Sequence, residues 1–245
     1  MMPIQSTQLR SLGVAIAMAL PVLACGAKQT TVKNEAGASP PPSEEVAVEK
    51  PTAPAFVMPE ADAAYYETAV ATLAAGTVEA IEAVDFTKFR FSFLEWKKEG
   101  IPEALETALS AAQESRDFAE QVALADKILA YDYTDIRIHL FKSYAQDAMG
   151  LDAGFHTSMV KALLDSIVAS GDGRTTRTAF HVAQVKEEYA LIHILGLERQ
   201  NQMLLSEGDR SFDLLQCVDE NGASFEIYFD ITVHMARLQA LLTGE

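Results

Sequence analysis

Five carboxylates and a tyrosine in the C-terminal part of the chain are the side chains best suited to chemistry. They are Asp172, Glu187, Glu188, Tyr189, Asp213 and Asp230. Carboxylates that converge in one cleft can exchange protons with a substrate or bind a hard cation. Convergence requires that the segment beginning at Thr178 pairs as a strand beside the segments that carry Asp213 and Asp230. These six residues are our candidates for a catalytic site.

The same residues also fit a structural interpretation, which we favour. Glu187 and Glu188 can lie in the first turn of a helix, where the helix dipole favours negative charge. Asp172 lies between two glycines in "SGDGRTT", which is typical of a turn. With Arg174 this loop could also bind phosphate, but it lacks the spaced glycine, lysine and hydroxyl of a P-loop.

Other kinds of site have little support in the sequence. The histidines form no close ligand pair and no HExxH motif, so a zinc site is not expected. No Gly-x-Ser-x-Gly motif is present, so the sequence does not support a serine nucleophile with a catalytic triad. Cys217 has apolar neighbours, which favour a core position. We predict no metal and no cofactor. The histidines are His139, His156, His181, His193 and His234.

The overall charge argues against nucleic acid as a partner. The chain has 19 lysines and arginines against 35 aspartates and glutamates, which gives a formal net charge of −16. A surface of this sign repels phosphate backbones. The acidic residues are spread along the chain, which indicates a solvated surface.

The N-terminus predicts export and lipid anchoring. Arg10 precedes "LGVAIAMALPVLA", which is long enough for the core of a signal peptide and short for a membrane span. The following "VLACG" resembles the bacterial lipoprotein box, in which the cysteine is lipidated, so residues 1–24 are the predicted signal peptide and Cys25 the predicted lipid anchor. Leu23 is bulky for this box, and cleavage after Ala27 is the alternative. Gly26, as the residue after the cysteine, favours delivery to the outer membrane.

A tether follows the predicted anchor. Residues 25–59 are rich in Ala, Ser, Thr, Pro, Glu and Val, with "SPPPSEE" near the centre. Such a segment cannot bury enough apolar area to offset its ordering entropy. We therefore predict a disordered tether and a single globular domain at residues 60–245.

The first part of this domain, residues 60–170, reads as helical. Residues 61–83 have high helical propensity with a break near Gly76. The phenylalanines of residues 86–96 fit both a strand and a helix, and we favour a helix with Asp85 as its N-cap. Pro102 and Thr134 mark two further helix starts. The short helices and short turns resemble tetratricopeptide-type helical hairpins in their packing style, although the sequence does not contain the complete tetratricopeptide consensus.

Residues 171–235 predict a small antiparallel sheet plus one helix, which makes the fold α+β. Asn221-Gly222 joins two alternating segments, as expected of a β-hairpin. A two-residue loop there would place Asp213 opposite Asp230, where two carboxylates repel unless a cation or proton intervenes. Residues 198–208 could add a strand, and residues 178–185 fit either a strand or a helix.

Four ordered segments carry a family resemblance: "KILAYDYTDIRIH", "GFHTSMVKALLDSIVASGDGRTTRTAF", "VKEEYALIHILG" and "EIYFDIT". From about Val84 to His234 the chain resembles domain-of-unknown-function family 4919, a bacterial family of exported, uncharacterised proteins described as lipoproteins. The resemblance implies a strand at Thr178 to Val185 and a helix at Lys186 to Leu195. It implies no activity.

The function that these features favour is binding. We expect a lipid-anchored protein on the outer membrane or the periplasmic face of the envelope, attached through Cys25, that acts as a binding or scaffold module for a protein or peptide partner. The alternative is a carboxylate-based envelope enzyme, a hydrolase or metal-dependent, with its site near the Gly-Asp-Gly loop and the Glu-Glu-Tyr element.

Overall fold

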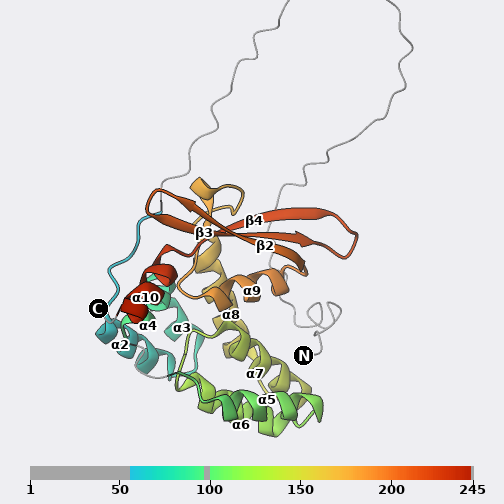
Figure 1. Cartoon of the computed structure of the whole chain (residues 1–245). Coiled ribbons are helices and arrows are strands. Elements are labelled where there is room, and N and C mark those ends of the chain that lie inside the picture. Colours follow the sequence, from blue (N-terminus) through green and yellow to red (C-terminus); the bar gives the residue numbers. More distant parts are fainter. Residues whose placement is uncertain (1–55, 97–99, 244–245) are drawn as a thin grey trace, which may run out of the picture. The chain divides into compact units, whose positions relative to one another are not determined.

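A computed structural model of the chain describes residues 56–96 and 100–243, and these ranges contain nine α-helices and a four-stranded sheet (Figure 1). The predicted signal peptide, Cys25 and residues 25–55 of the tether lie outside the described residues. The α+β class is confirmed. The helices are α2 (Ala63–Leu73), α3 (Val78–Glu82), α4 (Phe86–Trp96), α5 (Glu103–Glu114), α6 (Phe118–Leu129), α7 (Ile136–Ala148), α8 (Gly154–Val168), α9 (Val185–Ile194) and α10 (Thr232–Thr243). The strands are β1 (Phe180–His181), β2 (Glu198–Glu207), β3 (Arg210–Val218) and β4 (Ser224–Asp230).

Side-chain caps mark the starts of several helices, including α4 and α7. Asp85 accepts a hydrogen bond from the backbone N–H of Lys88, so the predicted cap of α4 is confirmed. The predicted cap of α7 is wrong by one residue, because Asp135 accepts from the backbone of Arg137 and Ile138. Thr134 is instead turned toward Asp132, to which its hydroxyl and its backbone N–H both donate.

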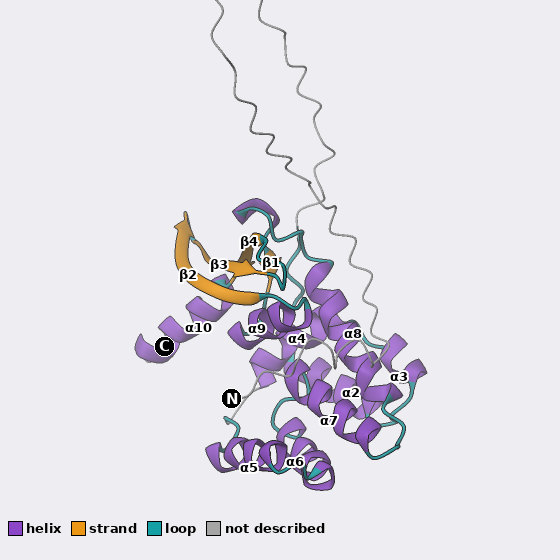
Figure 2. Ribbon diagram, turned by 90° about the vertical axis from the view of Figure 1, so that its right-hand side faces the viewer, coloured by secondary structure: helices purple, strands orange, loops and turns teal. Residues whose placement is uncertain are grey.

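Helix α4 is the most buried of the helices before the sheet. Phe86, Phe89, Phe91 and Phe93 are all buried, although they lie on different sides of the helix. A helix buried on most of its surface shows no single periodicity, and this explains why its sequence fitted two patterns. Helix α4 packs against α2 and α8 (Figure 2).

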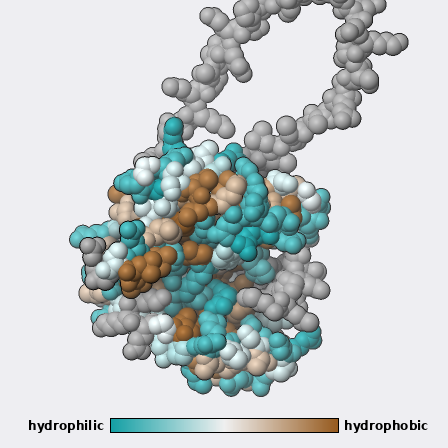
Figure 3. Space-filling model, in the orientation of Figure 1, coloured by the Kyte–Doolittle hydropathy of each residue, from teal (hydrophilic) through white to brown (hydrophobic). Residues whose placement is uncertain are grey.

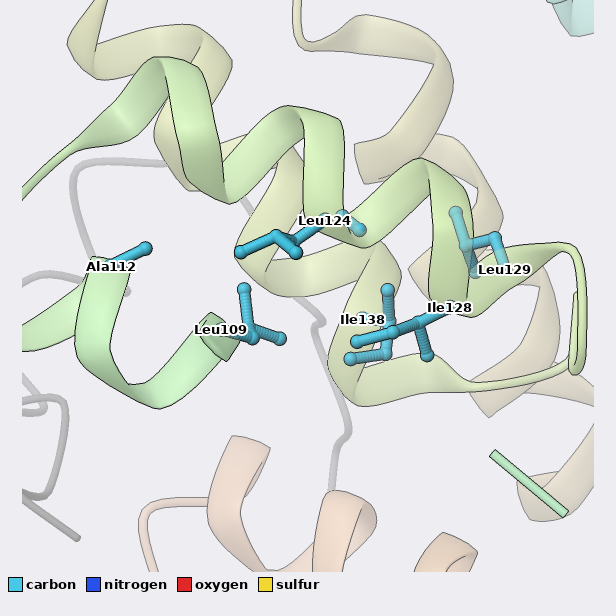
Figure 4. Close-up of a cluster of buried hydrophobic side chains, with 7 residues drawn as sticks. Leu109, Ala112, Leu124, Ile128, Leu129 and Ile138 are labelled. Atoms are coloured by element: carbon cyan, nitrogen blue, oxygen red, sulfur yellow. The ribbon is translucent and has the colours of Figure 1, made fainter. Parts of the chain in front are cut away.

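Helices α5 to α8 continue as consecutive packed neighbours, α5 with α6, α6 with α7 and α7 with α8. Leu109 of α5, Leu124 and Ile128 of α6, and Ile138 of α7 belong to one buried apolar cluster (Figure 4). The tetratricopeptide likeness stays a prediction. No helix in the described ranges is long and apolar enough to cross a membrane.

The sheet has the order β1-β4-β3-β2 and is mixed. The predicted antiparallel arrangement is wrong for β1, which pairs with β4 in parallel. The predicted strand at residues 178–185 is also too long, since residues 176–178 form a 3₁₀ turn and α9 begins at Val185. The loop folds back tightly, because the backbone N–H groups of Asp172 and Gly173 both donate to the carbonyl of Thr178. A Cβ on Gly173, whose φ is +67°, would lie 2.4 Å from the ring of Phe180.

The hairpin of β3 and β4 differs from the prediction by one residue of register. Asp219 pairs with Ala223 around a three-residue loop, in which Gly222 has a φ of +78°. Phe212 therefore lies opposite Asp230, and Asp213 opposite Phe229. Because residues directly opposite share a face, the predicted juxtaposition of Asp213 and Asp230 is wrong, and they lie on opposite faces of the sheet.

Helix α10 was not predicted from the sequence. It packs against β3 and has no buried residue. Its residues Leu238, Leu241 and Leu242 are exposed, and apolar side chains gather on the side of the molecule where α10 lies (Figure 3).

Candidate functional site

Helix α9 lies between the sheet and the helical part of the domain (Figures 1 and 2) and packs against both α7 and β2. Its first turn contains Lys186, Glu187 and Glu188, and both glutamates are buried. Successive residues of a helix point about 100° apart, so the three side chains reach different neighbours. Each of them has its own charged or proton-sharing partner, and we call this arrangement the α9 clamp.

Glu187 points toward the helical part and meets Arg90 of α4. The guanidinium Nη1 lies 2.6 Å from Glu187 Oε2, and Arg90 is fully buried. Arg90 Nε also donates to Ser166 Oγ at 2.8 Å, and Nη2 donates to the carbonyls of Ser166 and His181 at 3.3 Å. Burial raises the pKa of Glu187, against the attraction of Arg90. One guanidinium thus joins α4, α8, α9 and β1.

Glu188 points toward the sheet and meets Asp213 of β3. Neither carboxylate oxygen of Glu188 accepts a hydrogen bond from a donor in the described residues. An ionised Glu188 would therefore be a buried, unsatisfied charge. Burial and the nearby charge of Asp213 raise the pKa of Glu188 to about 9. The protonated carboxyl can then donate to Asp213, so the two groups share one proton.

Tyr189 connects to this pair only through a surface network. Gln202 Nε2 donates to Asp213 at 2.8 Å, and Gln202 Oε1 accepts from the hydroxyl of Tyr189 at 3.0 Å. Arg199 donates to the same Oε1 at 2.6 Å and lies over the ring of Tyr189. The polar groups of β2 therefore fix the orientation of Asp213.

The two remaining candidates, Asp230 and Asp172, lie elsewhere. Asp230 accepts from Arg210 and from the backbone of Thr232. These hydrogen bonds outweigh the effect of burial and lower the pKa of Asp230. Asp172 is exposed and accepts from the backbone of Arg174, as a turn residue does. The structure thus brings Glu188 and Asp213 together, links Tyr189 to them, and places Glu187, Asp230 and Asp172 in three other environments.

The third member of the α9 clamp was missed in the sequence. Lys186 Nζ lies 2.8 Å from Asp135 and also contacts Asp132, and both aspartates are buried. Burial opposes the ionisation of Asp135, but Lys186 and Arg137 outweigh it and lower its pKa. More than fifty residues separate Lys186 from these partners in the chain, so no local pattern indicates the contact. Within the described ranges, no group of three or more His, Cys, Asp or Glu is placed to hold a metal ion.

A second site, also missed in the sequence, is a cavity of about 620 Å³ among α2, α4, α6, α7 and α8. We call it the aromatic cavity, because five of its lining residues are aromatic: Tyr66, Trp96, Tyr133, Phe155 and His156. Tyr66 and Trp96 have ring centroids 4.8 Å apart. Its volume lies within the range of small-molecule sites, and it opens to solvent, since Glu67, Ala71 and Ala130 of its lining are exposed.

The polar end of the aromatic cavity is the buried His156, which is paired with a second buried histidine, His139, that does not line the cavity. His139 Nε2 lies 3.0 Å from the carbonyl of Tyr133, so this nitrogen carries the hydrogen. Burial lowers the pKa of His139 to about 4. The ring is therefore neutral at pH 7, and its Nδ1 accepts a hydrogen bond from Nδ1 of His156 at 2.9 Å.

His156 is consequently assigned one tautomer. Burial and the nearby His139 lower its pKa to about 3. With the hydrogen on Nδ1, the Nε2 of neutral His156 is an unprotonated acceptor. This Nε2 accepts no hydrogen bond from the described residues and is not among their fully buried unpaired atoms, and His156 lines the cavity.

Comparison with known protein families gives one match. The model of a domain of unknown function, DUF4919, matches residues 88–239. The chain belongs to the DUF4919 family. The match covers α9, the sheet and eight of the fifteen residues that line the aromatic cavity, but it leaves out α2 and the turn after it, which supply the other seven. No curated protein and no solved structure matches the chain.

The proton shared by Glu188 and Asp213 predicts a pH-dependent stability of this DUF4919 protein. The pKa of Glu188 rises from 4.5 to about 9 in the folded state. Between these values the folded state holds the extra proton, so the free energy of unfolding falls as the pH rises. Glu188→Gln still donates to Asp213 but does not titrate. Its stability relative to the parent should increase by ~2 kcal/mol or more between about pH 5 and about pH 8.

Urea denaturation at the two pH values measures this change. Glu226→Gln is the matched control, because Glu226 is an exposed carboxylate on the same hairpin. The effect of Glu226→Gln on the free energy of unfolding should differ by less than about 0.5 kcal/mol between the two pH values. A Glu188→Gln effect that is the same at both pH values would show that Glu188 is not protonated in the folded protein.

Proposed function

We propose that this DUF4919 protein is an exported, lipid-anchored binding module of the cell envelope, and that the aromatic cavity is its ligand site. The observation that carries the proposal is the combination of ring-lined walls with an accessible acceptor, His156 Nε2, at one end of the cavity. Ligand sites in proteins combine mainly apolar walls with a few directional polar groups. The predicted anchor at Cys25 and the tether would hold this domain near a membrane while leaving it free to meet ligands.

The carboxylate enzyme has less support. Its best arrangement is the pair of Glu188 and Asp213, which have relative exposures of 0% and 4%. A general acid or base has to come within hydrogen-bond reach of the substrate, directly or through one water. The contacts of Glu187 with Arg90 and of Asp230 with Arg210 fit a structural role, since each carboxylate already has a charged partner.

Trp96 makes ligand binding in the aromatic cavity directly observable. It is the only tryptophan of the chain and it lines the cavity. N-phenyl-1-naphthylamine is an uncharged aromatic fluorophore that absorbs where tryptophan emits. We expect it to bind with sensitised emission when Trp96 is excited, because the bound probe would lie beside the indole ring.

Two exposed alanines of α2 provide matched variants for this titration. Ala71 lines the cavity, whereas Ala64 does not. Ala71→Phe should weaken probe binding at least about fivefold by occupying cavity volume, whereas Ala64→Phe should leave it within about twofold of the parent. Binding that is unaffected by Ala71→Phe, or that gives no sensitised emission, would place the probe outside the cavity and contradict the proposal.

The predicted lipid anchor has a separate test. Incorporation of radiolabelled palmitate during expression in a bacterial host should be lost in Cys25→Ser, because the thiol is the acceptor in lipoproteins of the type that "VLACG" resembles. Cys217→Ser is the control, because it removes the one other cysteine of the sequence, and it should keep the label. Label that survives Cys25→Ser would rule out anchoring at this residue.

A further inference from the structure

We propose that the aromatic cavity selects uncharged, mainly aromatic molecules that donate one O–H or N–H hydrogen bond to Nε2 of His156. This inference rests on the proposed function, since it specifies the ligand class of the same cavity. It is carried by three observations: the fixed tautomer of His156, the pairing of the charged side chains in the wall, and the arrangement of the rings.

The histidine pair fixes the direction of the hydrogen bond. The carbonyl of Tyr133 can only accept, so the hydrogen on His139 Nε2 is fixed, and the hydrogen of His156 must lie on Nδ1. His156 has a relative exposure of only 6%. Its Nε2 therefore presents a lone pair in a largely apolar setting, where a donor on the ligand gains a hydrogen bond and an ether or hydrocarbon does not.

The charged side chains of the wall already have partners. Lys142 forms an ion pair with Asp126, and Glu67 accepts the indole N–H of Trp96 at 3.1 Å. A charged ligand would have to displace one of these contacts or lie in the cavity without a counter-ion, and the loss of water from its charge opposes binding beside the buried rings of Tyr66 and His156. The wall thus favours a neutral ligand.

The rings favour a flat, aromatic ligand. Tyr66 of α2 and Trp96 of α4 have ring centroids 4.8 Å apart, and Phe155 and His156 of α8 have ring centroids 5.1 Å apart. Aromatic side chains interact favourably with another ring, in stacked or edge-on geometry, beyond the area that they bury. A fused ring system with one hydroxyl group matches both the lining and the acceptor.

A pair of ligands that differ only in the donor tests the inference on the unaltered protein. The probes are 6-fluoro-2-naphthol and its methyl ether, and ¹⁹F NMR titration measures both affinities. We expect the naphthol to bind about tenfold more tightly than the ether, because the ether lacks the O–H group that donates to the buried acceptor. A third probe, 6-fluoro-2-naphthoate, should bind more weakly than the naphthol.

His156→Phe keeps a ring of similar size and removes the acceptor, so the naphthol and its ether should then bind within about twofold of each other. His193→Phe is the matched control, since His193 lies on α9 and does not line the cavity, and it should keep the tenfold preference.

Equal affinities in the unaltered protein, a preference that survives His156→Phe, or tighter binding of the naphthoate would overturn the inference. If N-phenyl-1-naphthylamine still binds beside Trp96, the proposed function survives that result; if neither it nor the naphthol binds, both proposals fail.

Discussion

The rest of the structure depends on the α9 clamp, because three consecutive ionisable residues at the start of one helix all have buried partners. Lys186 meets the buried aspartates before α7, Glu187 meets Arg90 of α4, and Glu188 shares a proton with Asp213 of β3. A buried charge without its partner costs several kcal/mol, about 3–5 when one partner of a buried pair is removed. The rotation and position of α9 are therefore fixed against both the helices and the sheet.

The clamp also positions the polar end of the aromatic cavity. Lys186 holds the turn that contains Asp132 and Asp135, and Tyr133 lies between them in the chain. The backbone N–H of Tyr133 donates to the hydroxyl of Tyr66, and its carbonyl accepts from His139. Lys186, which directly precedes the candidate carboxylates Glu187 and Glu188 in the chain, thus holds a turn whose Tyr133 lines a different site. This division of roles is the reason that we propose binding, with the carboxylates as structural elements.

The sequence predicts what depends on near neighbours in the chain and misses what depends on distant ones. The helix at residues 86–96, its Asp85 cap and the position of Glu187 and Glu188 in a first turn follow from local patterns. The predicted hairpin register was wrong because the loop has three residues and not two, which moves Asp213 and Asp230 to opposite faces of the sheet. The alternation of apolar and polar residues in the strands does not show how many residues form the loop. Arg90 lies 97 residues from Glu187, and the cavity gathers rings from separate helices, so neither has a local signal.

The most direct test of the central claim, that the aromatic cavity and not the carboxylates around α9 is the functional site, is a crystal structure of the protein isolated from its native host. The predicted result is ligand electron density beside Tyr66 and Trp96, with a donor within hydrogen-bond distance of His156 Nε2. Density bound instead at Glu188 and Asp213, with the cavity filled only by water, would contradict the claim.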